Sequence, residues 1–384
     1  MKKSVAVFLS VGFFVSCKTD RKTGQSDSIQ ARLEVVDSIQ VDLMVSYLNL
    51  MDVRDETGEM LLLQNSSSVA YLLSPDGEIL QKTDRPGDDP QAVGNEIFAA
   101  EFFEDGIALM GNGVIKTYDM QFNLRESFVI PYGHGGMVYS GYNHLQEATV
   151  DGEKFLTAFY GTQTDFPSHV LEYYKNFNVM DLVDTKTREF IPLGNLDENS
   201  RFLNGKAHNF LKPEYHTVDN MLYYAFTNDT ILHKLDLRTR EIIQTEPIPF
   251  DDFILFNGYT MGPPSIEEQS APSDMRGIIS KVFHVNGFDI ITYTSGIKLH
   301  KMEEQGDPGL GRAAYRERLD RLNYKKYLIL KNGKRLNTEL RLPEKLLAVE
   351  IASGDGFLWA SQNVDILEEE PDKVTLYKLQ VLMK

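Results

Sequence analysis

The segment TGEMLLLQN, residues 57–65, is a tight turn that leads at once into a run of apolar residues. This arrangement is typical of the turn and second strand of a β-hairpin. The same kind of unit recurs as EDGIALMGN (104–112), DGEKFLTAFYG (151–161), VDNMLYYAFTN (218–228), NGFDIITYTSG (286–296) and GDGFLWASQN (354–363). The six apolar runs start about 46 to 68 residues apart, and recurrence at such intervals indicates a repeat architecture.

Each unit is flanked by further strand candidates. A strand precedes it, as in EIFAAEFF (96–103) and KLLAVEIA (345–352), and in the first five units a hairpin follows it, as in VAYLLSPDGEILQKT (69–83). Four antiparallel strands repeated in this way are typical of the blades of a β-propeller. The sequence therefore predicts an all-β fold, a six-bladed β-propeller of four-stranded antiparallel blades over residues 33–384. A pair of β-sandwiches is the alternative.

The two ends of the predicted propeller are expected to meet. The sixth unit ends in the strand candidate DKVTLYKLQVL (372–382) with no hairpin after it, and the candidate LEVVDSIQVDLM (33–44) precedes the first unit without a partner of its own. Pairing of these two strands would complete the sixth blade and remove an open sheet edge. We therefore predict that the N-terminal strand closes the ring on the C-terminal strand.

The N-terminal segment has the features of a secretory signal. Lys2 and Lys3 precede an apolar run of 11 residues, Val5–Val15, which is shorter than the roughly 20 residues that span a bilayer. Ser16 followed by Cys17 resembles the cleavage and lipid-attachment site of a bacterial lipoprotein. This resemblance implies a lipoprotein signal peptide that ends just before the cysteine.

Cys17 is the only cysteine of the chain, so it cannot form an internal disulfide or a multi-cysteine metal site. We expect a signal peptide over residues 1–16, lipid attachment at Cys17 through acyl chains such as palmitate, and a lipid-anchored polar tether over residues 17–32. The alternative is that Cys17 is an ordinary buried small residue. The predicted location is the bacterial cell envelope, at the outer membrane, facing the periplasm or the exterior.

The net charge of the chain indicates which classes of binding partner to expect. Loss of Lys2 and Lys3 with the signal would leave 37 basic against 56 acidic residues, a net charge of −19. Such a surface repels phosphate backbones, which excludes nucleic acid as the expected partner. The expected partners are the membrane, through the lipid anchor, and a peptide, a glycan or another envelope protein.

The turn SPDGEI (74–79) and the loop RPGDDPQAVGNEIF (85–98), together with the lipoprotein signal and the six hairpin units, resemble the TolB-like six-bladed propeller lipoproteins of Bacteroides-type bacteria. Members of that family tend to carry a Gly-x-Gly-Pro-x-Glu pattern in this loop. Here Gly87, Pro90 and Glu96 stand at altered spacing. The resemblance implies the propeller fold and an envelope location, and it implies little about chemistry.

Four long segments interrupt the short turns, at residues 163–178, 194–214, 249–276 and 297–325. In a four-stranded meander these positions correspond to second-to-third strand loops and blade connections, which share one face of the ring. Loops of this length in a compact domain are usually functional or disordered. We expect an aromatic-rich cap on this face, over blades three to five, that binds the ligand. Its aromatic and histidine residues are Phe166, His169, Tyr173, Tyr174, Phe202, His208, Phe210, Phe253, Phe256, Tyr259 and Tyr315.

Residues near the starts of the inner strands should surround the mouth of the central channel. The predicted ligand-binding residues are Glu96, Tyr142, Tyr215, His216 and Arg276. No catalytic residue, metal site or cofactor is predicted, since the histidines have no tight metal-ligand spacing. Packing or a position on the rim is the alternative role for each of the five.

Known catalytic motifs give little support for an enzyme. GLGRAA (309–314) fits a nucleotide-binding glycine pattern, but no strand leads into it. It opens the only helix that the sequence predicts, over residues 309–327. The predicted function is a non-enzymatic envelope lipoprotein that binds a peptide, glycan or partner protein on the long-loop face. A propeller hydrolase or lyase acting on a glycan or peptide is the alternative.

Overall fold

The computed structural model of the protein describes residues 30–43, 48–85, 87–131, 144–161, 164–208, 211–263, 265, 271–306, 311–338, 340–367, 369 and 371–383. Within these ranges the chain forms six four-stranded antiparallel sheets and one two-stranded sheet. Contacts between inner strands join each four-stranded sheet to the next and the last to the first. The prediction of a six-bladed β-propeller is confirmed.

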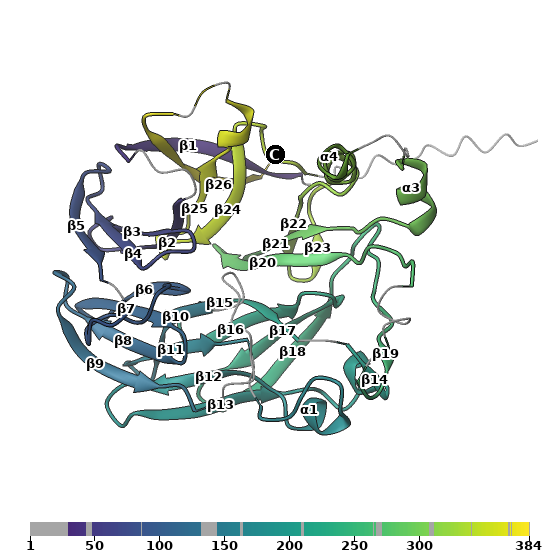
Figure 1. Ribbon diagram of the computed structural model, residues 1–384, viewed down its shortest axis with the longest axis horizontal. Helices are drawn as coiled ribbons and strands as arrows, with labels where there is room; N and C mark the ends of the chain where they lie inside the picture. Colours follow the sequence, from purple (N-terminus) through teal and green to yellow (C-terminus); the bar gives the residue numbers. More distant parts are fainter. Residues whose placement is uncertain are drawn as a thin grey trace, which may run out of the picture.

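The blades follow one another along the chain (Figure 1). Blade 1 contains β2 (Leu48–Val53), β3 (Met60–Gln64), β4 (Val69–Leu73) and β5 (Ile79–Asp84); blade 2 contains β6 (Ala99–Phe103), β7 (Gly106–Gly111), β8 (Val114–Tyr118) and β9 (Leu124–Val129). Blade 3 contains β10 (His144–Val150), β11 (Glu153–Phe159), β12 (Asn178–Asp184) and β13 (Glu189–Asn195); blade 4 contains β15 (Pro213–Val218), β16 (Met221–Phe226), β17 (Ile231–Asp236) and β18 (Glu241–Pro247). Blade 5 contains β20 (Ile278–Val285), β21 (Phe288–Thr294), β22 (Lys326–Lys331) and β23 (Lys334–Arg335); blade 6 contains β24 (Leu346–Ala352), β25 (Leu358–Gln362), β26 (Val374–Met383) and β1 (Ala31–Val41).

The recurring unit of the sequence is the turn and second strand of each blade. Strands β3, β7, β11, β16, β21 and β25 all lie inside the six quoted segments. Two of the turns contain residue pairs with positive φ, Asp151 (51°) with Gly152 (86°) and Asn286 (52°) with Gly287 (74°). Such pairs fit two-residue hairpin turns, whose twist matches that of the strands. The local turn chemistry therefore sets the first two strands of these blades.

Strand β1 closes the ring. It pairs antiparallel with β26, from Ala31 opposite Met383 to Val41 opposite Val374, and Figure 1 shows β1, in purple, beside β26, in yellow. The predicted closure is confirmed. The strand begins at Ala31, two residues inside the segment that we expected to be tether.

The core lies between the blades. Buried apolar residues in the described ranges form six clusters, and each cluster joins two neighbouring blades. At the interface of blades 6 and 1, for example, Met60 and Leu62 pack with Leu376, and all three are fully buried. Every blade therefore depends on its neighbours for the burial of its apolar faces.

The long segments add small elements on one side of the propeller, along the right of Figure 1. These elements are α1 (Leu171–Lys175), η1 (Arg201–Leu203), β14 (Lys206–Ala207), β19 (Tyr259–Thr260), α3 (Leu299–Glu304) and α4 (Arg312–Leu322), while η2 (Val364–Ile366) lies in blade 6. The predicted helix corresponds to α4 but ends earlier, because β22 already begins at Lys326. The short helices α1 and α3 were not predicted. Within the described ranges, no helix has the length and apolar character needed to cross a membrane.

Candidate functional site

The six inner strands, β2, β6, β10, β15, β20 and β24, surround a central channel. Its cavity has a volume of about 1640 Å³ and is lined by residues from all six blades. At one mouth lie the short turns after the inner strands, including Asp55 and Asn286. At the other mouth lie residues of the long-loop face, including Arg276 and Lys325.

The channel side of each inner strand is a sheet edge, so its backbone N–H groups need partners from outside the blade. Polar side chains of the neighbouring inner strand supply several of them. The Asp52 carboxylate of blade 1 accepts from the Phe102 N–H of blade 2 at 2.8 Å. The Glu101 carboxylate of blade 2 accepts from the Glu147 N–H of blade 3 at 2.9 Å.

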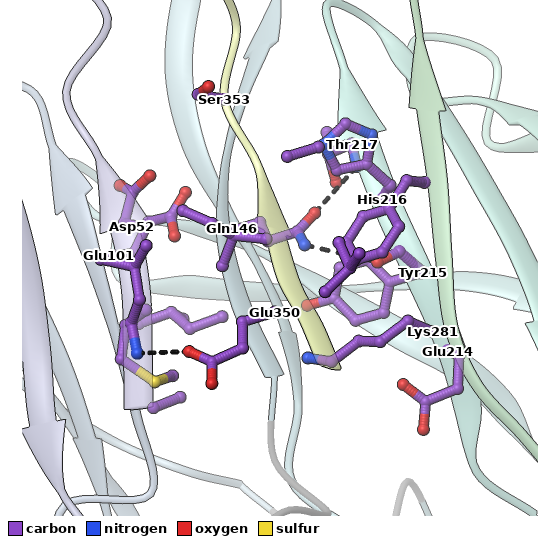
Figure 2. A pocket seen from close by; sticks show the side chains of 18 of the residues that line it. Asp52, Glu101, Gln146, Glu214, Tyr215, His216, Thr217, Lys281, Glu350 and Ser353 are labelled. Carbon is purple, nitrogen blue, oxygen red and sulfur yellow. Dashed lines mark hydrogen bonds between the residues drawn. The ribbon is translucent and has the colours of Figure 1, made fainter. Parts of the chain in front are cut away.

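The same kind of hydrogen bond, from a backbone N–H to a side chain of the neighbouring blade, joins other blades. Gln146 accepts from the Thr217 N–H at 2.8 Å and donates to the Tyr215 carbonyl at 3.3 Å, as Figure 2 shows. His216 Nδ1 accepts from the His284 N–H at 3.1 Å.

Two further hydrogen bonds complete the series of contacts between neighbouring blades around the channel. Glu350 of blade 6 accepts from the Leu50 N–H of blade 1 at 2.6 Å. Between blades 5 and 6, the Tyr327 hydroxyl of the third strand β22 accepts from the Val349 N–H at 3.2 Å. Five inner strands thus each direct an acceptor side chain at the next blade, and β20 does not.

Burial in the channel shifts the ionisation of these groups. Desolvation raises the pKa of Asp52 to about 7, although the Phe102 and Val53 N–H groups oppose the shift. Desolvation, and then the charge of Asp52, raise the pKa of Glu101 well above its usual value. Desolvation also raises the pKa of Glu350 and lowers that of His216 to about 4. The channel therefore favours neutral carboxyls and a neutral imidazole.

Lys281 differs from the acceptors on the other inner strands. Its ammonium group is a donor only, and in Figure 2 it points across the channel toward Glu350. Within the described residues no carboxylate lies within 4.0 Å of its Nζ. Desolvation lowers the pKa of Lys281, and the negative charges of Glu214 and Glu350 oppose that shift.

Two other lysines stand beside it. Lys212 forms an ion pair with the buried Glu214 at 2.7 Å. Lys325 comes from the segment before β22 and lines the channel on the long-loop side. Desolvation lowers the pKa of Lys325; the charge of Glu350 opposes this shift, and the charge of Lys281 acts in the same direction as desolvation. Blades 4 and 5 therefore bring amino groups to one wall of the channel, across from Asp52 and Glu101 (Figure 2).

Only some of the five site residues predicted from the sequence line the channel. Tyr215, His216 and Arg276 line the channel, whereas Glu96 is absent from its lining and only its neighbour Ile97 takes part. Tyr142 lies outside the described residues, as does Cys17 with the predicted signal peptide.

Tyr215 and His216 have structural contacts in addition. The Tyr215 hydroxyl is directed away from the channel and donates to the Thr157 carbonyl at 3.0 Å. His216 accepts a backbone N–H through one ring nitrogen. Arg276 is exposed at the long-loop mouth, with its guanidinium 5.9 Å from the Phe256 ring centre. Of these three, Arg276 is the residue best placed to meet an incoming ligand.

Asp52, Glu101, Lys281, Lys325 and Glu350 were missed by the sequence analysis. A signal for some of them existed, because a single charged residue interrupts an apolar inner strand in AAEFF (99–103) and LLAVEIA (346–352). A charge within an apolar strand indicates a buried polar role. The sequence does not reveal that these charges converge on one channel.

Four of the aromatic and histidine residues of the long loops pack inward. Tyr173, Tyr174 and Phe202 are at most 3% exposed and belong to the cluster between blades 3 and 4. His208 is also buried. For these four residues the expected ligand contact is wrong, because their rings form the core that orders the loops. Phe166 is 43% exposed. Partial exposure is found for His169, Phe253, Phe256, Tyr259 and Tyr315, and Phe210 lies outside the described residues.

Backbone contacts join the long segments to one another. The Gly262 N–H donates to the His169 carbonyl at 2.9 Å, and β14 pairs with β19. Met275 and Ile297 form a further antiparallel bridge. All four segments are thus linked over blades three to five, as the loop assignment predicted. Their described residues frame the channel mouth as a connected rim.

The raised pKa of Asp52 predicts a pH-dependent stability difference. A carboxyl with a pKa of about 7 in the folded state and 3.8 otherwise favours folding below pH 4, and this contribution is lost as the pH rises through 7. Asp52→Asn has no ionisable group at this position, so its unfolding free energy does not fall in this way as the pH rises. Relative to wild type, the variant should gain on the order of 2 kcal/mol in unfolding free energy between pH 5 and pH 8.

Urea denaturation at both pH values measures this change. The exposed Asp372→Asn variant is the control and should follow the wild type at both pH values. Parallel pH profiles for Asp52→Asn and wild type would show that the Asp52 carboxyl ionises normally in the channel.

Among the described residues, no group of three or more His, Cys, Asp or Glu side chains has an arrangement that could hold a metal ion. The carboxyls of the channel are instead engaged with backbone N–H groups of neighbouring blades. The arrangement can accept and donate hydrogen bonds to a polar ligand from several blades at once.

Comparisons with known proteins give the fold. No protein-family model matches the chain, and no curated protein matches it. Among solved structures, a member of the DUF4221 family from Bacteroides vulgatus is similar with a TM-score of 0.63 and 10% identity, covering 93% of this chain and 100% of that one. A candidate exported protein from Bacteroides fragilis is similar with a TM-score of 0.52 and 13% identity, covering 92% and 95%. At these identities the likeness supports the architecture alone.

Proposed function

We propose that the protein is a non-enzymatic binding protein of the bacterial cell envelope, and that its channel holds a peptide, a glycan or a segment of a partner protein. The observation that carries this proposal is the cavity of about 1640 Å³ into which all six blades direct polar side chains. A concave site with polar groups converging from several elements is the usual form of a binding site. The ligand is taken up through the mouth on the long-loop face.

The rigidity of that mouth supports the proposal. Asn228, in the loop after β16, donates to the carbonyls of Ile254 and Gly277 at 3.1 and 2.7 Å and accepts from the Phe256 N–H at 2.7 Å. One side chain thus fixes three points of the connection between blades 4 and 5. A site held in place before binding loses less entropy when the ligand arrives.

The envelope location rests on the sequence and on one similar structure. The N-terminal segment resembles a lipoprotein signal, and the similar Bacteroides fragilis protein is described as a candidate exported protein. On this proposal, Cys17 carries the lipid and the propeller belongs to the TolB-like lipoproteins, at the outer membrane.

A labelling experiment tests the anchor. Cells that express the full chain are fed an alkyne-tagged palmitate, and the protein should become labelled and stay with the membrane fraction. Cys17→Ser should lose the label, because the acyl chains have no other thiol in this chain. Equal labelling of Cys17→Ser would exclude the lipid anchor.

A plugged channel tests the binding function. Asn49 is an exposed residue of β2 that lines the channel, so Asn49→Trp should obstruct it. The probes are a panel of neutral and acidic tetrasaccharides and tetrapeptides. A probe at 100 times its Kd stabilises the folded state by about 2.7 kcal/mol, so it should raise the Tm of the wild type by several degrees but not that of Asn49→Trp.

Gln81→Trp, an equal change on the exposed outer strand β5, is the control and should respond to the probes like the wild type. The proposal would be overturned if no probe shifted the Tm of the wild type. It would also be overturned if Asn49→Trp responded as strongly as the wild type.

The Asp52 and Glu101 pair favours one second candidate, a glycan hydrolase. Hydrolysis of a glycosidic bond commonly uses one protonated and one ionised carboxyl, and the raised pKa values of this pair suit that division. Release of new reducing ends from an oligosaccharide, lost in Asp52→Asn, would support the hydrolase. Binding without such release would support the binding protein.

A further inference from the structure

The inner strand β20 breaks the pattern of the other five. Asp52, Glu101, Gln146, His216 and Glu350 each satisfy a backbone N–H of the neighbouring blade. Each of these side chains therefore has a structural reason to be polar. Lys281 has none, because an ammonium group cannot accept a hydrogen bond.

A partly buried lysine without a partner is costly, since desolvation opposes its charge; the exposure of Lys281 is intermediate. In the channel, Lys281 is accompanied by Glu350 and Glu214, but the first accepts the Leu50 N–H and the second pairs with Lys212. Lys325 faces the same region and has no carboxylate within 4.0 Å among the described residues. Two amino groups thus line the same cavity, and neither has an ion pair with a described residue.

We propose that Lys281 and Lys325 bind a carboxylate of the ligand, so that the channel selects molecules with an anionic end. This inference rests on the proposed binding function and specifies its ligand. The anionic end lies at the wall of blade 5, between the deep Lys281 and the more exposed Lys325. Binding would give both amino groups the carboxylate partner that the described part of the chain does not provide.

The opposite wall restricts the rest of the ligand. Asp52 and Glu101 lie across the channel from Lys281 (Figure 2), and carboxyl groups, neutral or ionised, offer no positive charge to a second anion while they accept hydrogen bonds from hydroxyl or N–H groups. A polyanion is therefore disfavoured. The preferred ligand has one carboxylate and an uncharged remainder rich in hydrogen-bond donors, as in an acidic sugar or a peptide with a free C-terminus.

Calorimetric titration with matched probes tests this selection and separates the two sources of the carboxylate. The sugar pair is a trisaccharide that ends in one uronate and the same trisaccharide with that uronate as its methyl ester. The peptide pair is N-acetyl-tetraalanine as the free acid and as the C-terminal amide. For the source that the channel uses, the acid should bind at least about 10-fold more tightly than its neutral counterpart, because hydrogen bonds to charged groups are the stronger class.

Substitutions of the two lysines test which side chains are responsible for the preference for the acid. Lys281→Met should fold, because it replaces a desolvated charge with an apolar side chain of similar length, and it should lose most of the preference for the acid, with only the smaller contribution of Lys325 left. Lys281→Arg should keep the preference for the acid. Lys325→Gln should weaken binding of the acid by a smaller factor, since Lys325 is more exposed. The exposed Lys334→Gln on β23 should behave like the wild type.

The outcomes distinguish this inference from the proposed function. If acid and neutral probes bind equally to the wild type and Asn49→Trp abolishes both, the channel binds ligands but carboxylate selection is wrong. If Lys281→Met keeps the full wild-type preference for the acid, the assignment of Lys281 is wrong. If none of the four probes binds, the carboxylate inference fails, and the wider panel of neutral probes decides the proposed function separately.

Discussion

Deletion of residues 1–43 should abolish cooperative folding of the propeller. The deletion removes β1, which pairs with β26 from Ala31 to Val41, and it exposes the edge of β26 together with the apolar cluster between blades 6 and 1. Val41 is fully buried in that cluster. Thermal denaturation followed by circular dichroism should show no sharp transition, whereas deletion of residues 1–29 alone should leave the Tm unchanged.

A circular permutant shows whether pairing with β26, and not the position of β1 in the chain, is what matters. Ala31 lies opposite Met383, so a short linker from Lys384 to residue 30 can join the two strands as a hairpin. The permutant would start at residue 44 and end at residue 43. It should unfold cooperatively near the Tm of the wild type. An unfolded permutant, or a cooperative Tm for the 1–43 deletion, would contradict ring closure by β1.

Tyr174→Ala should destabilise the protein by about 3 to 5 kcal/mol, which is typical for the truncation of a buried aromatic side chain. The Tyr174 ring is 1% exposed. Its hydroxyl donates to the Ser168 carbonyl at 2.7 Å and accepts from the His208 N–H at 2.6 Å. The truncation therefore leaves a cavity and two unpaired backbone groups, and urea denaturation measures the loss.

Two further variants separate the contributions. Tyr174→Phe keeps the ring and should cost about 1 to 3 kcal/mol, the usual penalty for unsatisfied buried polar groups. Phe166→Ala, at a 43% exposed position of the same loop, should stay within about 0.5 kcal/mol of the wild type. If Tyr174→Ala were as stable as Phe166→Ala, the buried packing of the loop aromatics would be wrong. Hydrogen exchange over residues 164–208 should show whether the loss is local.

The fold could be predicted because its deciding signals are local. Each hairpin can be recognised in the sequence from a turn such as Asp151-Gly152. Few other residue pairs adopt the positive φ values of this turn easily. Six such signals fix the number of blades. The strand candidates at the two ends of the propeller have no other predicted partner. Pairing of β1 with β26 is therefore the simplest arrangement that completes the sixth blade.

The channel could not be read from the sequence in the same way. Whether the charge in AAEFF (99–103) satisfies a neighbouring backbone or meets a ligand depends on the blade beside it, and strands of adjacent blades are far apart in sequence. The Glu101 carboxylate, for example, reaches the N–H of Glu147. Lys281 stands out only after the acceptor role of the other inner-strand side chains is known.

The aromatic loops illustrate a second limit. Aromatic content in a long loop fits both a ligand-binding surface and a buried core, because the ring has the same apolar area in either case. Tyr173 and Phe202 pack beneath the loop backbone and are at most 3% exposed. The burial of each ring depends on tertiary contacts such as those between α1 and η1, which no local pattern encodes.

Ligand binding inside the channel formed by the six inner strands can be observed in a crystal structure of the protein with the tightest of the tested saccharide or peptide probes. We expect electron density for the probe inside the channel, with its carboxylate in contact with the Lys281 amino group. Density on the outer strands or on the loops over blades three to five, with an empty channel, would contradict it.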